Sequence, residues 1–208
     1  MDNHWATENL QVIRTIMERA AIYRRALAPI MTVAGCIGLA GATLPCFIPI
    51  ASNRAFSLYW MIVSLAAAAA SFLLVRRQAL KEDEPFWSPP TKRVIQAMLP
   101  VLLVGSIMGG TCAIQDSALP STAWLLSLAW VLTYGCGLHA AGFFMVRGIK
   151  LFGWFFVMAG CGLLLLAGFL PGLRTTEAAH YIMGVFFGLL HLAYGIYLYF
   201  TEQKKKPE

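Results

Sequence analysis

Long apolar runs, separated by short polar segments, dominate the pattern of residues along this chain. A helix needs about 20 apolar residues to cross the hydrocarbon core of a bilayer, and six runs reach that length. They cover residues 28–51, 55–75, 94–114, 122–146, 151–171 and 178–200. The pattern therefore predicts an all-α, polytopic membrane protein with six transmembrane helices over residues 28–200.

The polar remainder is an N-terminal arm over residues 1–27, a middle loop over 76–93, short turns and a basic tail over 201–208. None of these segments is long enough for a soluble domain. In the arm, apolar positions such as Ile13 and Met17 recur at helical spacing, with polar residues on the other half. The arm is predicted to form an amphipathic helix that lies in the headgroup layer or docks against a partner protein.

Charge then gives an expected orientation. Of the 208 residues 59% are apolar and 12% charged, whereas soluble domains carry about 25% charged residues. The arm, the middle loop, the connection at 147–150 and the tail hold fourteen of the sixteen Lys and Arg residues; Arg54 and Arg174 are the other two. Because short cytoplasmic segments retain positive charge, both termini are predicted to be cytoplasmic. The net charge of +6 indicates topology and attraction to anionic lipid, and no nucleic-acid partner.

Small residues mark the faces on which the helices are expected to pack. In lipid, helix association relies on close backbone approach at Gly and Ala. The expected packing glycines are Gly35, Gly105, Gly109, Gly135, Gly142, Gly184, Gly188 and Gly195. His139 shares a helical face with two of them, and His191 shares a face with three. Both histidines are therefore predicted to point into the bundle.

These two histidines are the candidate site, because His139 and His191 lie at one depth, about 12–14 Å from the cytoplasmic edge. In one reading each neutral imidazole hydrogen-bonds to a carbonyl, Thr133, Tyr134 or Tyr194 and fixes helix register. In another, the two rings coordinate haem or another metal from facing helices. In a third, they line a conduction or ligand pocket. We favour the first reading, and His139 is the expected counterpart of His191.

Other chemistry-bearing residues give weaker patterns. The five cysteines form no CxxC pair or zinc spacing, and Cys46 and Cys112, nearest the outer face, are the pair that could form a disulfide. His180, near Glu177, is expected at an exposed polar rim, and Trp60 in an interfacial belt. No Asp, Glu, Lys or Arg falls inside the six predicted spans, which disfavours carboxylate-coupled transport. No catalytic motif is present.

Internal similarity suggests a repeat. The first span reads "VAGCIGLAGATLP" and the fifth "MAGCGLLLLAGFLP", while "GLHAAG" in the fourth echoes "LHLAYG" in the sixth. Self-similarity of this kind is the signature of repeated structural units. It predicts three parallel helical hairpins related about an axis normal to the bilayer.

Three longer stretches carry a family resemblance: "IRTIMERAAIYRRAL" before the first span, "YGCGLHAAGFF" in the fourth and "GVFFGLLHLAYGIYLYF" in the last. Through them the chain resembles, over nearly its whole length, a family of uncharacterised bacterial six-span membrane proteins. The shared motifs are Ile-Arg-x-x-Met-Glu-Arg, here Ile13 to Arg19, and His-x-x-Tyr-Gly-Ile, here His191 to Ile196. The resemblance implies a bacterial inner-membrane location. Genes of that family often neighbour a winged-helix regulator, which implies a sensing or regulatory role.

Three functions remain open at this point. The first is a non-enzymatic accessory or sensory protein that binds a membrane or cytoplasmic protein partner, or a small apolar ligand within the helix bundle. The second is a haem-binding or redox membrane subunit that uses His139 and His191. The third is a small transporter or channel without carboxylate coupling. The first is the expected function, with the lipid bilayer as surroundings, no catalytic residue and no resident cofactor, and the glycine pairs permit an oligomer.

Overall fold

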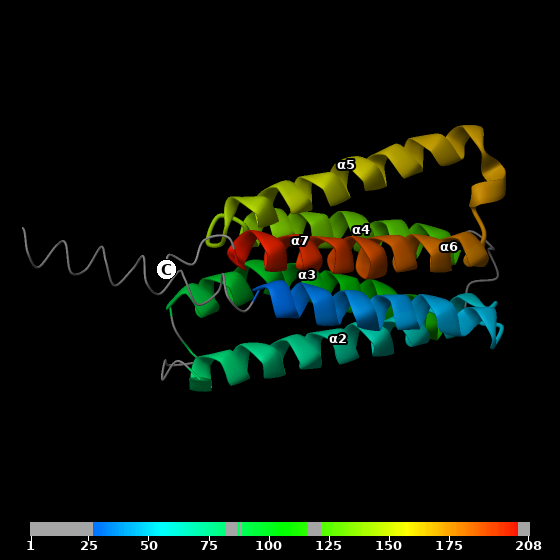
Figure 1. The fold of residues 1–208 in the computed structure, drawn as a ribbon. Helices are drawn as coiled ribbons and strands as arrows, with labels where there is room; N and C mark the ends of the chain where they lie inside the picture. The colour runs from blue at the N-terminus through cyan, green and yellow to red at the C-terminus, as the bar shows by residue number, and fades with distance from the viewer. Residues whose placement is uncertain (1–26, 82–86, 88, 116–121, 204–208) are drawn as a thin grey trace, which may run out of the picture.

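The computed structural model describes residues 27–81, 87, 89–115 and 122–203. Within those ranges every regular element is a helix, and six helices are long and apolar enough to cross a membrane (Figure 1). The predicted all-α, six-span architecture is confirmed. The predicted amphipathic arm up to residue 26, and the tail from residue 204, lie outside the described residues.

The six spans follow one another through short connections. The first is Leu27–Cys46, which ends in the 3-10 turn η1 at Leu44–Cys46. The next four are α2 at Asn53–Lys81, α3 at Pro89–Gln115, α4 at Thr122–Ala141 and α5 at Arg147–Phe169. After the 3-10 turn η2 at Pro171–Leu173, the last span runs through α6 at Thr176–Met183, the π-helical segment η3 at Gly184–Leu189 and α7 at Leu190–Gln203.

Helices α2 and α3 are longer than the apolar runs that predict them. α2 has 29 residues and continues past residue 75, and α3 already begins at Pro89. A helix of 29 residues is about 44 Å long, whereas the hydrocarbon core is about 30 Å thick. The extra turns carry Arg76, Arg77 and Lys81. The loop predicted at 76–93 is therefore shorter than expected. The end of an apolar run marks where the chain leaves the hydrocarbon core, but it does not mark where the helix ends.

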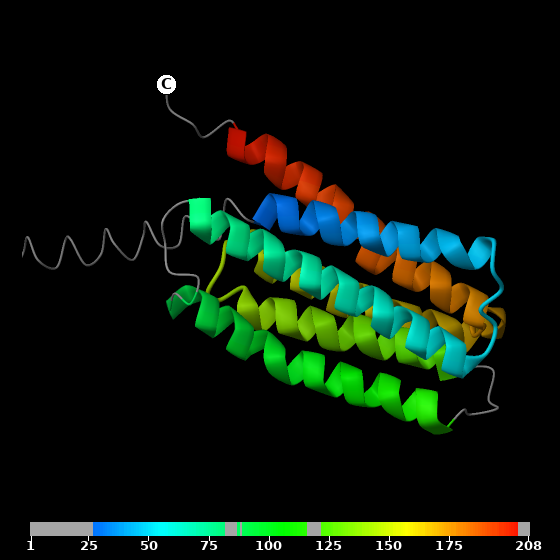
Figure 2. The ribbon, with the colours of Figure 1, turned by 90° about the horizontal axis from the view of Figure 1, so that it is seen from below.

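Both described ends of the chain lie at the same end of the bundle, since the six spans alternate in direction (Figures 1 and 2). We call it the basic end, because it holds Arg76, Arg77, Lys81, Lys92, Arg93, Arg147 and Lys150. The opposite end holds the turns η1 and η2, with Arg54 and Arg174 beside them. The charge asymmetry of the sequence thus coincides with the two ends of the fold.

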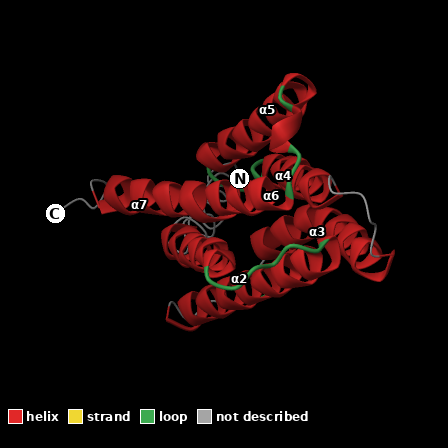
Figure 3. Ribbon diagram, turned by 90° about the vertical axis from the view of Figure 1, so that its right-hand side faces the viewer, coloured by secondary structure: helices red, strands yellow, loops and turns green. Residues whose placement is uncertain are grey.

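Helix α4 is the central helix of the bundle. It packs against α2, α3, α5 and α6, and the end-on view in Figure 3 shows it between α3 and α5. Buried residues make up 50% of its apolar window, against 6% of the corresponding window of α2. α4 therefore organises the core, whereas α2 lies at the periphery.

The first and last spans touch backbone to backbone. A Cβ added to Gly188 would lie 2.8 Å from the backbone nitrogen of Leu39, which is closer than real Cβ atoms come. Gly35, Gly184 and Gly195 face the opposite helix of this pair just as closely. Four of the expected packing glycines therefore lie in one interface.

Helices α4 and α5 form a second close pair. A Cβ on Gly142 would lie 2.7 Å from the Cα of Lys150, and one on Gly135 would lie 2.8 Å from the Cβ of Phe156. Gly153 of α5 faces α4 in the same way. The two tight pairs join helices from different predicted hairpins, so the closest packing does not follow the expected three-hairpin repeat.

The remaining expected packing glycines, Gly105 and Gly109 on α3, receive bulkier neighbours. Trp130 of α4 lies against both, and its indole nitrogen donates a 2.9 Å hydrogen bond to the Gly105 carbonyl. From α2, the Ser57 hydroxyl donates a 2.7 Å hydrogen bond to the Gly109 carbonyl. The sulfur of Met61 would lie 2.8 Å from a Cβ at Gly109. α3 is thereby held between α2 and α4.

We expect Gly35→Ala to destabilise the fold, because the new Cβ would collide with the backbone of Leu192. The expected loss is about 1–3 kcal/mol of unfolding free energy, measured as a lower midpoint of thermal unfolding in detergent. Gly162→Ala is the matched control, since a Cβ there meets nothing within 4 Å. Helix propensity predicts that the control is neutral or slightly stabilising. Equal midpoints for the two variants would contradict the tight packing of the first span.

Candidate functional site

His191 is buried where α7 begins, and both of its ring nitrogens are hydrogen-bonded. Its side chain is 3% exposed. Nδ1 lies 2.8 Å from the carbonyl oxygen of Phe186, and Nε2 lies 2.9 Å from the hydroxyl of Tyr134 on α4. Because a carbonyl only accepts, Nδ1 carries the proton and donates, so Nε2 of the neutral ring accepts from the Tyr134 hydroxyl. A carbonyl and Tyr134 were both among the predicted partners.

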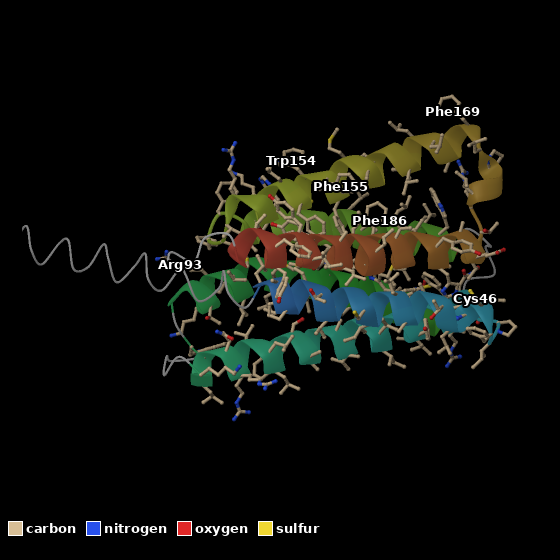
Figure 4. All side chains as sticks on the ribbon, viewed as in Figure 1. Cys46, Arg93, Trp154, Phe155, Phe169 and Phe186 are labelled. Atoms are coloured by element: carbon tan, nitrogen blue, oxygen red, sulfur yellow. The ribbon has the colours of Figure 1, made fainter. Side chains whose placement is uncertain are left out.

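Aromatic rings enclose this imidazole. Phe152 and Phe156 of α5 stand edge-on to it, with ring centroids 5.4 and 5.6 Å away, and Phe187 stacks on it at 6.0 Å. Phe186, labelled in Figure 4, faces α5, where its ring lies 5.1 Å from that of Phe156. In such apolar surroundings an unpaired ring nitrogen would be costly. The two hydrogen bonds therefore hold the ring in one orientation.

The π-helical segment η3 supplies the carbonyl that His191 uses. Backbone bonds in a π-helix join residues five apart, and His191 follows Phe186 by five residues. Gly184 and Gly188 belong to the same segment and hold it against the first span. π-helical turns are frequent at functional sites, and here the turn coincides with the bonded histidine.

His139 lies on a different side of α4 from Tyr134. Its ring is 5.3 Å from that of Phe143 and 5.3 Å from that of Trp154 on α5. Its Nδ1 is buried without a hydrogen-bond partner among the described residues. Tyr134 and His139 are five residues apart, which turns them by about 140° around an α-helix. The hydrogen-bond partner of His191 is therefore Tyr134, one of the predicted partners, whereas His139, the expected counterpart, packs against Trp154 of α5.

Haem does not fit between the two predicted ligands. Axial ligation needs a ring nitrogen that is free to bind iron, and both nitrogens of His191 already contact protein groups. His139 faces α5 rather than the last span. Across residues 27–81, 87, 89–115 and 122–203, no three His, Cys, Asp or Glu side chains gather as a metal site requires. We therefore derive no chemistry through a haem or metal here.

His180 forms a second buried group that the sequence analysis missed. Nε1 of Trp60 on α2 donates to its Nδ1 at 3.0 Å, so Nε2 carries the ring proton and donates to the carbonyl of Ile50 at 3.1 Å. His180 is 7% exposed and Trp60 1%. The predicted exposed rim at His180 is therefore wrong, and the Trp60 ring is buried against other helices rather than turned toward lipid. The available signal was weak: a buried Trp needs a partner for its indole N–H.

Two other predicted contacts are absent from the described part of the chain. Tyr194, considered as a partner for the histidines, stacks on Phe152 at 4.7 Å, and its hydroxyl is buried without a hydrogen-bond partner there. Cys46 is an exposed thiol, whereas Cys112 is a buried thiol whose sulfur lies 3.8 Å from the carbonyl oxygen of Asn53. The disulfide considered between these two cysteines is therefore not formed.

The fold and these contacts define an all-α integral membrane protein in which two buried histidines connect the last span to its neighbours. Comparisons with protein-family models, with curated proteins and with solved structures give no match. Chemically, His180 links the last span to α2 and to the Ile50 carbonyl, and His191 links it to α4. Both imidazoles act as neutral donor and acceptor at once, an arrangement that orients helices.

The contacts assign opposite tautomers to these histidines, with His191 protonated at Nδ1 and His180 at Nε2. In ¹⁵N spectra of histidine-labelled protein, each tautomer should therefore appear, and His191→Gln and His180→Gln should each remove one assigned ring. The measurement is independent of stability. The same tautomer at both sites would contradict the assigned hydrogen bonds.

Tyr134→Phe should destabilise the protein, because it removes the hydroxyl that donates to Nε2 of His191. A buried nitrogen left unpaired costs about 1–3 kcal/mol, which thermal unfolding in detergent should resolve. Tyr197→Phe is the matched control, since that side chain is 60% exposed. An unfolding midpoint unchanged by Tyr134→Phe would show that the contact adds nothing to stability.

Proposed function

We propose that the protein is a non-enzymatic accessory membrane protein that binds a transmembrane helix of another protein through α2. The observation that carries this proposal is the low coverage of α2 by its own chain. Buried residues make up 6% of its apolar window, against 17% to 50% for the other five spans. A helix with so few internal contacts has most of its surface available for a second protein.

The middle of α2 offers a surface suited to a second helix. Its buried residues lie in the first turns, from Asn53 to Trp60, and at Ala79. Between them, Ser64 and Ala68 are exposed and one turn apart, beside a run of alanines. Small residues at this spacing allow two helix backbones to approach closely in lipid. Because this surface lies inside the apolar run, the partner is a membrane helix and not a soluble domain.

The buried chemistry supports a role without catalysis. His180 and His191 each commit both ring nitrogens to contacts within the protein, and no Asp, Glu, Lys or Arg lies inside the predicted spans. Imidazoles bonded at both nitrogens hold helices in place, whereas acid–base catalysis and ion conduction need titratable groups that a substrate or an ion can reach. A regulatory or sensory duty, as the family resemblance implies, would then act through the partner bound at α2.

Location is part of the same proposal. We place the protein in a bacterial inner membrane with the basic end, and hence both termini, in the cytoplasm. The resemblance to bacterial six-span proteins supports the membrane, and the concentration of Lys and Arg at the basic end supports the orientation.

Photo-crosslinking in native membranes tests the partner. A photoreactive residue at Ala68 should give an adduct of one discrete mass. The same residue at Met158 should give lipid adducts alone, because Met158 is 64% exposed on α5, across the bundle from α2 (Figure 1). Ala68→Leu should abolish the adduct formed from position 64, since the larger side chain prevents close approach.

Identical adducts from Ala68 and Met158, or none from either, would rule out partner binding through α2. An adduct at Ala68 with the mass of two copies of this chain would also overturn the proposal, because it would make α2 a self-association surface.

A further inference from the structure

We propose that the surface formed by α4 and α5 at the basic end binds the headgroup of an anionic phospholipid. Four side chains form the site, which we call the α4–α5 cluster: His139 of α4, Phe143 in the turn that follows α4, and Lys150 and Trp154 of α5. The cluster lies across the bundle from α2 (Figure 1), so it is independent of the partner site proposed there.

The four side chains contact one another across the two helices. The Phe143 ring lies 5.3 Å from that of His139. Trp154 follows Lys150 by four residues within α5, so these two side chains share one side of that helix. Between the helices, Lys150 Nζ lies 3.7 Å from the centroid of the Phe143 ring, and the His139 and Trp154 rings are 5.3 Å apart. The close approach of the two backbones at Gly142 makes these contacts possible.

The ammonium group of Lys150 has no carboxylate beside it among the described side chains. Glu177, whose position is described, lies in the first turn of α6 at the opposite end of the bundle. The face of the Phe143 ring attracts the cation but accepts none of the strong hydrogen bonds that an ammonium donates. Arg93 lies over the Phe144 ring at 5.9 Å and adds a second cation at the same end. The cluster therefore complements an anion.

Exposed aromatic rings favour a lipid over a free anion. The Phe143 side chain is 63% exposed and that of Trp154 is 49%. Figure 4 shows Trp154 toward the end of α5 at which Arg93 also lies. Aromatic rings at this level contact the region between headgroups and acyl chains. A phospholipid would place its phosphate on Lys150 and its glycerol and upper chains along the rings, whereas inorganic phosphate would use the ammonium alone.

The buried Nδ1 of His139 is a further sign that the cluster is incomplete. That nitrogen has no hydrogen-bond partner among the described residues, and an unpaired buried polar atom is unfavourable. A headgroup oxygen that reached this nitrogen would supply the missing partner.

Native mass spectrometry of the protein in detergent tests the proposal. We expect phosphatidylglycerol to be retained in preference to phosphatidylcholine. Lys150→Gln should weaken retention about fivefold, the effect expected for one basic residue at a membrane surface, and Lys150→Arg should preserve it. Phe143→Leu keeps every charge and should also weaken retention. Lys81→Gln removes an exposed lysine from α2 at the same end and should leave retention unchanged.

Several results would overturn the site. If Lys81→Gln and Lys150→Gln weakened lipid retention equally, retention would depend on the overall positive charge and not on this cluster. If phosphatidylglycerol and phosphatidylcholine were retained equally, the site would not select an anionic headgroup. Displacement of phosphatidylglycerol by inorganic phosphate would assign the cluster to a free anion. Circular dichroism of each variant establishes that retention is compared between folded proteins. If Lys150→Gln fails to fold, the proposal is tested by Phe143→Leu, and unchanged lipid retention in that variant would overturn it.

Discussion

Close contact between helix backbones is the constraint on which the rest of this structure depends. Inside lipid, an apolar side chain gains little free energy when it contacts another side chain in place of an acyl chain. Helix association is therefore driven by close packing and hydrogen bonding. Gly35 and Gly188 bring the first and last spans together, and Gly142 and Gly153 do the same for α4 and α5. Larger side chains there would separate the helices, and the polar contacts that depend on their spacing would be lost.

The two histidine contacts fix the last span at two levels. His180 joins it to Trp60 of α2, and His191 joins it to Tyr134 of α4. Glycine contacts set how closely two helices approach, whereas these hydrogen bonds are directional and costly to leave unmade in an apolar interior. The glycines therefore provide proximity, and the imidazoles select one rotation and one height.

Local pattern was sufficient for the spans, but not for the pairing of side chains across helices. Apolar length predicts the helices, and the cost of burying an imidazole predicts a bonded partner for His191. Depth along a span also follows from the sequence, whereas rotation depends on neighbouring helices; the expected pairing of His191 with His139 failed for that reason. Trp60 and His180 are 120 residues apart, and each alone also fits a position at the membrane interface. The sequence therefore did not indicate that these two side chains pair.

The π-helical segment Gly184–Leu189 has a consequence for how the last span is divided. Such a turn accommodates one residue more than a regular helix of the same length, which shifts the angular phase of everything after it by about 100°. His180, in the first half, can therefore bond to Trp60 of α2, while His191, in the second half, bonds to Tyr134 of α4 and lies among the rings of α5. With this one extra residue, a continuous helix presents different sides to its neighbours before and after the π-helical turn. Deletion of that residue would rotate the His191 ring away from the Tyr134 hydroxyl.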